Sequence, residues 1–158
     1  PKNAVSLSII IYFKIYFNYY TKMNEKSYKV FPLKRITAGI YDFFLLLGVW
    51  FAVGSIALWL NGGETLNPWL GLSLVILSSW SFFAYFWLNG NKTLGMAVWN
   101  IEIYSLDGKK ITFKQISIRF LANILILFLA GLPLLQIYFS QKGLAINDTL
   151  SKTALKII

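Results

Sequence analysis

Long uncharged stretches dominate the pattern of hydrophobic and polar positions along this chain. Three windows, residues 43–63, 65–91 and 120–141, contain no Asp, Glu, Lys or Arg. The hydrocarbon core of a bilayer is roughly 30 Å thick, so a helix needs about 20 apolar residues to cross it, and each window is long enough. A surface helix of a soluble domain would instead alternate apolar and polar faces. The pattern therefore predicts an all-α integral membrane protein, with clear spans at about 36–60 and 69–88.

The flanks of the first span indicate its orientation. The sequence Asn61-Gly62-Gly63 ends it in a turn, and the loop from there to Pro68 has no Lys or Arg. The chain before the span is basic, with Lys26, Lys29, Lys34 and Arg35 against Glu25. Because loops rich in Lys and Arg stay in the cytoplasm, we expect a multi-pass protein of the cell membrane with its N-terminal side cytoplasmic.

The polar segment 89–115 predicts a small β-hairpin at the cytoplasmic surface. Apolar and polar residues alternate over 99–104, which is the period of a strand. The pair Asp107-Gly108 is a favoured tight turn, and 110–113 could return as the second strand. An irregular loop is the alternative.

The third apolar segment, 116–139, allows two topologies. As a straight span it would place the tail, 140–158, outside the cell. The tail is basic, however, and Gly131-Leu132-Pro133 offers a break, since proline removes a helix hydrogen bond and clashes with the preceding turn. Two half-helices meeting there would form a re-entrant hairpin and return the chain to its starting side. Only then could 153–158 add a strand to the surface hairpin.

Composition narrows the range of functions that the chain could have. The chain has 158 residues, is 57% hydrophobic, carries a net charge of +9 and contains neither cysteine nor histidine. Its basic residues lie outside the apolar windows, which favours membrane topology and contact with anionic lipid over binding to nucleic acid. No combination of residues supports a reaction, a metal site or a cofactor. We therefore expect a non-enzymatic protein with no cofactor.

The first 22 residues differ from the rest. They are rich in Ile, Tyr, Phe, Asn and Lys, and their apolar part is interrupted by Lys14 and Asn18. We interpret 1–22 as an upstream or non-native extension, with Met23 as the natural start and 23–158 as a single membrane domain.

The first candidate for chemistry is a pair of charges at the start of the first span. Arg35 and Asp42 are seven residues apart, so on a helix they share a face about 10.5 Å apart along the axis. Ala38 and Gly39 lie between them and would let another helix, or water, come close. An ionised carboxylate at this depth needs a partner or water. Asp42 therefore either handles a proton or cation, or pairs with a basic residue to fix helix packing.

Two polar residues in the third segment are candidate partners for Asp42. Arg119 and Asn123 are four apart and would face together on a helix. The alternatives are a lipid anchor for Arg119 and a hydrogen bond between helices for Asn123.

These positions together resemble the RDD family of small bacterial membrane proteins, which is named for one arginine and two aspartates. The family's RxxAxxxD pattern is similar to residues 35–42, its TxGK element to residues 93–96, and its HDxxxxT element to residues 147–153. The resemblance therefore implies functional roles for Arg35, Asp42 and Asp148, supported by Ala38, Thr93, Gly95 and Thr153. Gly39, Arg119 and Asn123 are supporting candidates from helix geometry alone. Met96 replaces the family's usual lysine, and Asn147 replaces its histidine.

Two functions follow as expectations. Cation–proton exchange has been ascribed to some members of the family, which implies a transport-related protein. In such a protein Asp42 would exchange a proton with a cation or substrate, and Arg35 would tune the pKa of Asp42. With three apolar segments, one copy could hardly enclose a pathway, so transport would need a homo-oligomer or a larger membrane complex. The alternative is a non-transporting scaffold or modulator of a partner complex.

Overall fold

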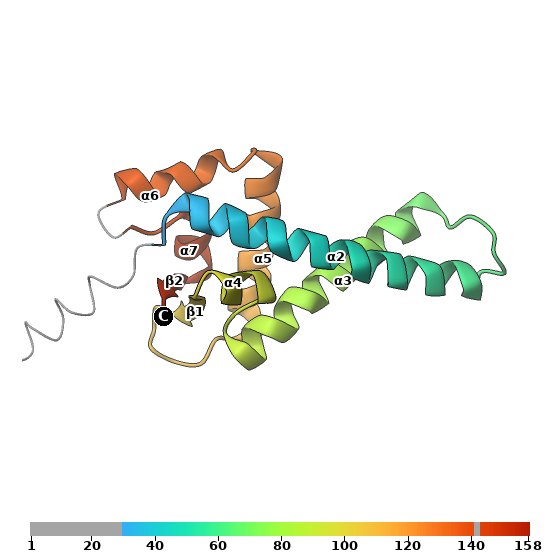
Figure 1. Cartoon of the computed structure of the whole chain (residues 1–158), viewed down its shortest axis with the longest axis horizontal. Helices are drawn as coiled ribbons and strands as arrows, with labels where there is room; N and C mark the ends of the chain where they lie inside the picture. The colour runs from blue at the N-terminus through green and yellow to red at the C-terminus, as the bar shows by residue number, and fades with distance from the viewer. Residues whose placement is uncertain (1–29, 141–142) are drawn as a thin grey trace, which may run out of the picture.

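The structure, a computed structural model, describes residues 30–140 and 143–158. Its two longest helices, α2 (Pro32–Leu60) and α3 (Pro68–Gly90), form a hairpin that projects from a smaller body built by the other elements (Figure 1). Both helices are long and apolar enough to cross a membrane, as predicted.

Two predictions fall outside the described residues. These are the extension at residues 1–22 and the natural start at Met23. Lys26 and Lys29, which contribute to the predicted cytoplasmic orientation, also precede the described chain.

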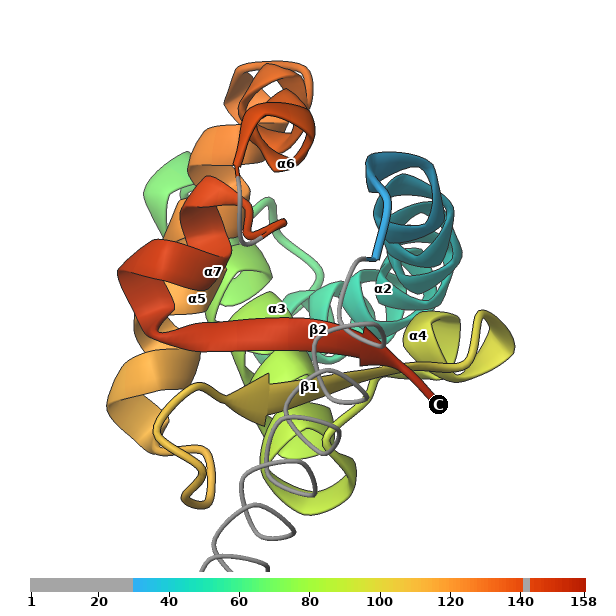
Figure 2. The ribbon, with the colours of Figure 1, turned by 90° about the vertical axis from the view of Figure 1, so that its left-hand side faces the viewer.

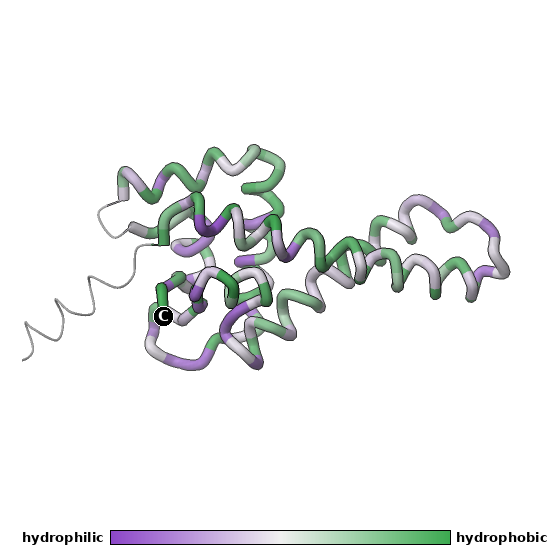
Figure 3. The backbone as a smooth tube through the Cα atoms, viewed as in Figure 1, coloured by the Kyte–Doolittle hydropathy of each residue, from purple (hydrophilic) through white to green (hydrophobic). Residues whose placement is uncertain are grey.

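Local sequence explains where the two long helices begin and end. Pro32 starts α2 at a position where a missing backbone N–H costs nothing. Gly62 and Gly63 end the helix with positive φ angles of 69° and 84°, which glycine adopts without steric cost. Asn67 caps α3 by accepting a hydrogen bond of 2.9 Å from the backbone N–H of Trp69. Figure 3 shows hydrophobic residues along both helices and hydrophilic residues at the turn that joins them.

The far half of the hairpin leaves large apolar side chains uncovered. Phe51, Trp59 and Trp69 are 80%, 78% and 77% exposed. Contiguous apolar surface of this kind is unfavourable in water and marks contact with another apolar phase or partner. The arrangement agrees with the membrane-spanning character that the sequence predicts.

A two-stranded antiparallel sheet is present, but the predicted hairpin is wrong. Strand β1 (Ile101–Ser105) pairs with β2 (Thr153–Ile157) from the C-terminal tail. The predicted second strand, 110–113, forms no strand, because Thr112 and Gln115 make a capping box and Phe113 opens a helix. Burial alternates along β1, as its sequence predicts. The prediction therefore identified the first strand, and it offered 153–158 only as an added strand, whereas this segment is the partner of β1.

The third apolar segment is broken where the sequence offers a break. Helix α5 (Phe113–Phe128) is followed by the short helices η1 (Leu132–Leu135) and α6 (Gln136–Phe139), which turn away at 106°. Ala130 and Gly131 have positive φ angles of 50° and 77° at the corner. The segment is therefore bent, and the geometry suits a broken span or a re-entrant loop.

The C-terminal tail returns to the body of the molecule. Helix α7 (Ile146–Ser151) packs against α5, and β2 then lies beside β1 near the start of α2 (Figures 1 and 2). The tail thus lies at the same end of the α2–α3 hairpin as β1. A hydrophobic core at this end includes Trp87, Ile103 and Ile116.

Candidate functional site

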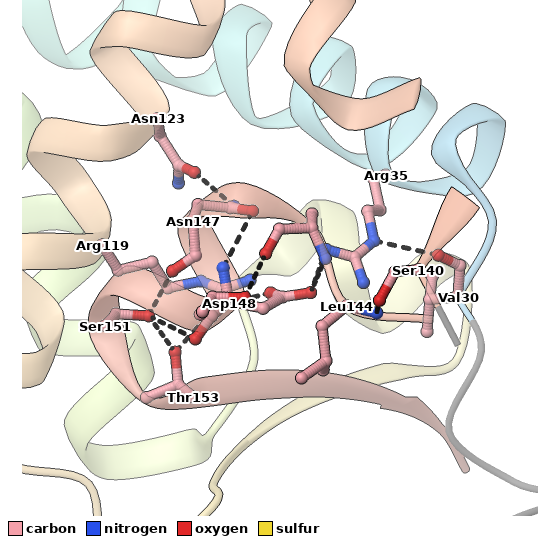
Figure 4. Close-up of polar contacts among 12 residues, drawn as sticks. Val30, Arg35, Arg119, Asn123, Ser140, Leu144, Asn147, Asp148, Ser151 and Thr153 are labelled. Carbon is pink, nitrogen blue, oxygen red and sulfur yellow. Dashed lines mark hydrogen bonds and ion pairs between the residues drawn. The ribbon is translucent and has the colours of Figure 1, made fainter. Parts of the chain in front are cut away.

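A buried cluster of three charges joins the first helix to the tail. Asp148, on α7, has no exposed surface. Its Oδ2 lies 2.7 Å from Nη1 of Arg35, and its Oδ1 lies 2.9 Å from Nη1 of Arg119 (Figure 4). Both guanidinium side chains are themselves at least 95% buried. We refer to Arg35, Arg119 and Asp148 as the ion-pair cluster.

The order of elements explains why these charges meet. Arg35 lies in the first turn of α2, where its Nε donates to the carbonyl of Val30 at 2.9 Å. Asp148 is the third residue of α7 and also accepts a hydrogen bond of 3.0 Å from the backbone N–H of Ala145. A carboxylate in the first turn of a helix satisfies donors that the helix leaves free. Asp148 therefore stabilises the start of α7 and pairs with two helices at once.

Hydroxyl groups and an aromatic ring surround Arg119. Its Nη1 donates to Oγ1 of Thr153 at 2.7 Å, and that hydroxyl lies 2.6 Å from Oγ of Ser151. The guanidinium carbon lies 5.9 Å from the ring centre of Trp87, within the range of a cation–π contact. Arg119 is thus a buried structural partner, and a lipid anchor does not describe it.

Asn123 makes the hydrogen bond between helices that the sequence analysis offered as an alternative. Nδ2 of Asn147, on α7, donates to Oδ1 of Asn123 at 2.7 Å. Neither Asn123 nor Arg119 contacts Asp42 by any hydrogen bond or ion pair among the described residues. The predicted partners of Asp42 are therefore wrong, because α7 engages both: Asn147 donates to Asn123, and Asp148 pairs with Arg119.

Asp42 is held by the short helix α4 (Leu94–Val98). Its Oδ2 accepts a hydrogen bond of 2.5 Å from Oγ1 of Thr93, and its Oδ1 accepts one of 2.8 Å from the backbone N–H of Gly95. In the described part of the chain no ion pair joins it to Arg35, although both lie on α2. The two partners sit in the TxGK-like element, so that motif positions the first aspartate.

Close backbone contact between α2 and α4 explains why small residues lie where these two helices meet. A Cβ atom built on Gly95 would overlap the carbonyl oxygen of Ala38 and come within 2.9 Å of the Asp42 carboxyl carbon. Ala38 is itself buried. Gly39, in contrast, has no neighbour within 4 Å of its Cβ position. Ala38 and Gly95 therefore allow α4 to reach Asp42, whereas Gly39 borders open space.

That open space is a cavity of about 520 Å³ between α2, α3 and α5. Its walls are mainly apolar. Its polar and charged lining residues are Arg35, Asp42, Thr93, Arg119, Asn123 and Asn147. Asp148 does not line it. The two aspartates thus differ: Asp42 borders the cavity, whereas Asp148 is enclosed by the ion-pair cluster.

The two long apolar helices, the bent third segment and the buried charges define a helical membrane protein. A sequence model of the RDD family matches residues 30–152, which include Arg35, Asp42 and Asp148. The chain therefore belongs to the RDD family of membrane proteins. No curated protein and no solved structure matches it.

The two residues that depart from the family pattern are both packed inside the protein. Met96 stands where the family usually has lysine, and it packs in the hydrophobic core. Asn147 stands where the family has histidine, and besides bonding Asn123 its Oδ1 accepts from the N–H of Asp148 at 3.1 Å. Ser151 and Trp87, which sequence reasoning missed, complete the surroundings of Arg119. Ser151 lies inside the HDxxxxT-like element, which was the available signal.

Proposed function

We propose that this RDD protein is a transport-related membrane protein in which Asp42 exchanges a proton or a cation at the wall of the cavity. The observation that supports the proposal is the placement of the two aspartates. Asp42 lines the cavity, and its partners there are two neutral donors, a hydroxyl and a backbone N–H. A carboxylate inside an apolar helix is costly and is most often retained for function.

Asp148 has a different role in this proposal. A proton or cation could reach it only by displacing one of two guanidinium groups, each within 2.9 Å of a carboxylate oxygen. Removing a charge from such a buried arrangement leaves the remaining charges uncompensated. We therefore assign Asp148 and the ion-pair cluster to holding α2, α5 and α7 together, and exchange to Asp42.

A complete pathway would require more than one copy or a partner. The cavity is open on one side, and its rim includes exposed apolar residues such as Ile40 and Leu127. A second copy, or another membrane protein, placed against this side would close it.

Flux through reconstituted protein tests the proposal. In proteoliposomes, we expect a gradient of Na⁺ or K⁺ to drive proton movement, read with a pH-sensitive dye, and Asp42→Asn to reduce it to the level of empty vesicles. Asparagine keeps a side-chain oxygen to accept from the N–H of Gly95, so the fold should survive.

Glu64→Gln is the matched control. Glu64 is an exposed acid in the turn between α2 and α3, away from the cavity, so its amide variant should retain full flux. Normal flux from Asp42→Asn would contradict a role for this carboxylate in exchange.

A scaffold or modulator of a partner complex is the second candidate. The observation that favours it is that all four oxygens of Asp42 and Asp148 already have partners within the chain. This candidate is favoured if the wild-type protein carries neither cation in the flux assay and co-purifies with a larger membrane complex.

We also propose that the N-terminal end of α2 and the C-terminal tail share the cytoplasmic side. The pairing of β1 with β2 supports a shared side, and the basic residues of this end support the cytoplasm. A phosphatase reporter fused after Ile158 should be inactive in cells, because that enzyme requires an oxidising compartment, and a fluorescent reporter there should be active. An active phosphatase fusion would place the tail outside.

A further inference from the structure

The cavity combines an apolar wall with one charged end. Its volume of about 520 Å³ lies within the range of roughly 300–1,000 Å³ that is typical of small-molecule sites. Figure 2 shows α2 on one side and α5 with α6 on the other, and the cavity lies between α2 and α5. The apolar wall includes Ile36, Ile40 and Phe43 from α2 and Leu127 from α5. These four side chains are also exposed, so the cavity is open along an apolar border.

The charged end has a donor without an acceptor. Within the described residues, Nη1 and Nη2 of Arg35 are both buried and neither makes a hydrogen bond of good geometry; Nη1 lies at ion-pair distance from Asp148, whereas Nη2 has no partner. Burying a charged donor without an acceptor is costly, so a native site usually supplies one. The ion-pair cluster also contains two guanidinium groups and one carboxylate. An anionic oxygen entering here would satisfy the donor and balance the extra positive charge.

We propose that this cavity binds an anionic phospholipid, with its phosphate against Arg35 and an acyl chain along the apolar wall. Guanidinium groups suit phosphate because they present several N–H donors in one plane. Basic pockets between membrane helices bind anionic lipid headgroups for the same reason. The apolar border distinguishes this occupant from a free anion, which would gain nothing from Ile40 or Phe43.

The depth of Arg35 agrees with a headgroup. Arg35 is the fourth residue of α2, so it lies only about 5 Å along the axis from the start of the helix. Asp42, at about 15 Å, lies much deeper and is already bound by Thr93 and Gly95. The phosphate would therefore lie near the membrane surface and the acyl chain would extend toward the level of Asp42.

Native mass spectrometry of the delipidated full chain in detergent tests the proposal. The probes are phosphatidylglycerol, phosphatidylcholine and inorganic phosphate, each at the same concentration. We expect a one-to-one complex with phosphatidylglycerol that is at least about tenfold tighter than that with phosphatidylcholine, since one charge-assisted hydrogen bond contributes that much. Inorganic phosphate alone should not bind measurably.

Two variants and a control locate the site. Gly39→Phe fills the cavity from a position with open space around its Cβ and should abolish the complex. Gly48→Phe, on the same helix with equally open surroundings but away from the cavity, should bind like wild type. Arg35→Lys keeps a cation for Asp148 but removes the second guanidinium nitrogen. The affinity of this variant for phosphatidylglycerol should therefore fall toward its affinity for phosphatidylcholine.

Three results would overturn the proposal. They are equal affinity of the wild type for the two lipids, an undiminished complex with Gly39→Phe, and tight binding of inorganic phosphate without lipid. The affinities of the wild-type protein for phosphatidylglycerol and phosphatidylcholine test the proposal even if Gly39→Phe fails to fold. The assay has no ion gradient, so its outcome is independent of exchange at Asp42.

Discussion

Replacing Asp148 by asparagine is expected to destabilise the folded protein by about 3–5 kcal/mol, because the change leaves two buried guanidinium groups without a counter-charge. Arg35 and Arg119 both lie within 2.9 Å of this carboxylate, and their side chains are only 5% and 3% exposed. The loss should separate α7 from both α2 and α5. Denaturant unfolding in detergent, followed by tryptophan fluorescence, measures it.

The control for this change is Asp107→Asn. Asp107 is exposed in the turn after β1, so its replacement should alter the free energy of unfolding by no more than about 0.5 kcal/mol.

Replacing all three members of the ion-pair cluster by apolar residues should lower the free energy of unfolding less than Asp148→Asn alone, since no charge then remains buried. Equal stability of Asp148→Asn and Asp107→Asn would contradict the structural role of the cluster.

Replacing Gly95 by alanine is expected to cost about 1–3 kcal/mol, because the added methyl group overlaps backbone in a packed crossing. It would collide with the carbonyl oxygen of Ala38 and press on the carboxyl group of Asp42. To accommodate it, α4 must move away from α2, and the hydrogen bond from the N–H of Gly95 to Asp42 lengthens or breaks. The same unfolding measurement detects the loss.

Gly54→Ala is the matched control for that substitution. Gly54 lies inside α2, has no atom within 4 Å of its Cβ position, and its replacement should stabilise the helix by up to about 1 kcal/mol. If Gly95→Ala were as stable as Gly54→Ala, the close approach of α4 to α2 would not exist in solution.

The long helices and the break in the third segment were predictable because their signals are local. An uncharged run of sufficient length specifies a span, and Gly131 with Pro133 specifies a break. Each signal lies within one segment of the chain. The predicted spans at 36–60 and 69–88 therefore agree with α2 and α3 to within a few residues.

The partner of β1 was harder to predict because strand pairing is not local. The segment 110–113 is adjacent to a good turn, which favours a hairpin, yet Thr112 and Gln115 also encode a helix cap. The helix prevails because β2 offers β1 a full antiparallel partner from Thr153 to Ile157. A capping pattern beside a turn was the available signal against the hairpin.

The sequence predicted which residues form the candidate site, but it did not predict which of them bind one another. Arg35 and Asp42 share a face of α2, as their spacing requires, and each then finds a partner far along the chain. Helical periodicity assigns residues to a face, but it does not identify what approaches that face. The motif resemblance included Thr93 and Asp148 without indicating that they bind different members of the pair.

The position of Asp148 after both arginines in the sequence has a consequence for biosynthesis. Translation proceeds from the N-terminus, so α2 and α5, with their two arginines, leave the ribosome before the only acid that pairs with both in the ion-pair cluster. Until α7 emerges, Arg35 and Arg119 must remain hydrated or at the headgroup level. The ion pairs that join α7 to α2 and α5 therefore form only after α7 has been synthesised, and a chain terminated before α7 would present two unneutralised cations to the quality-control machinery of the membrane.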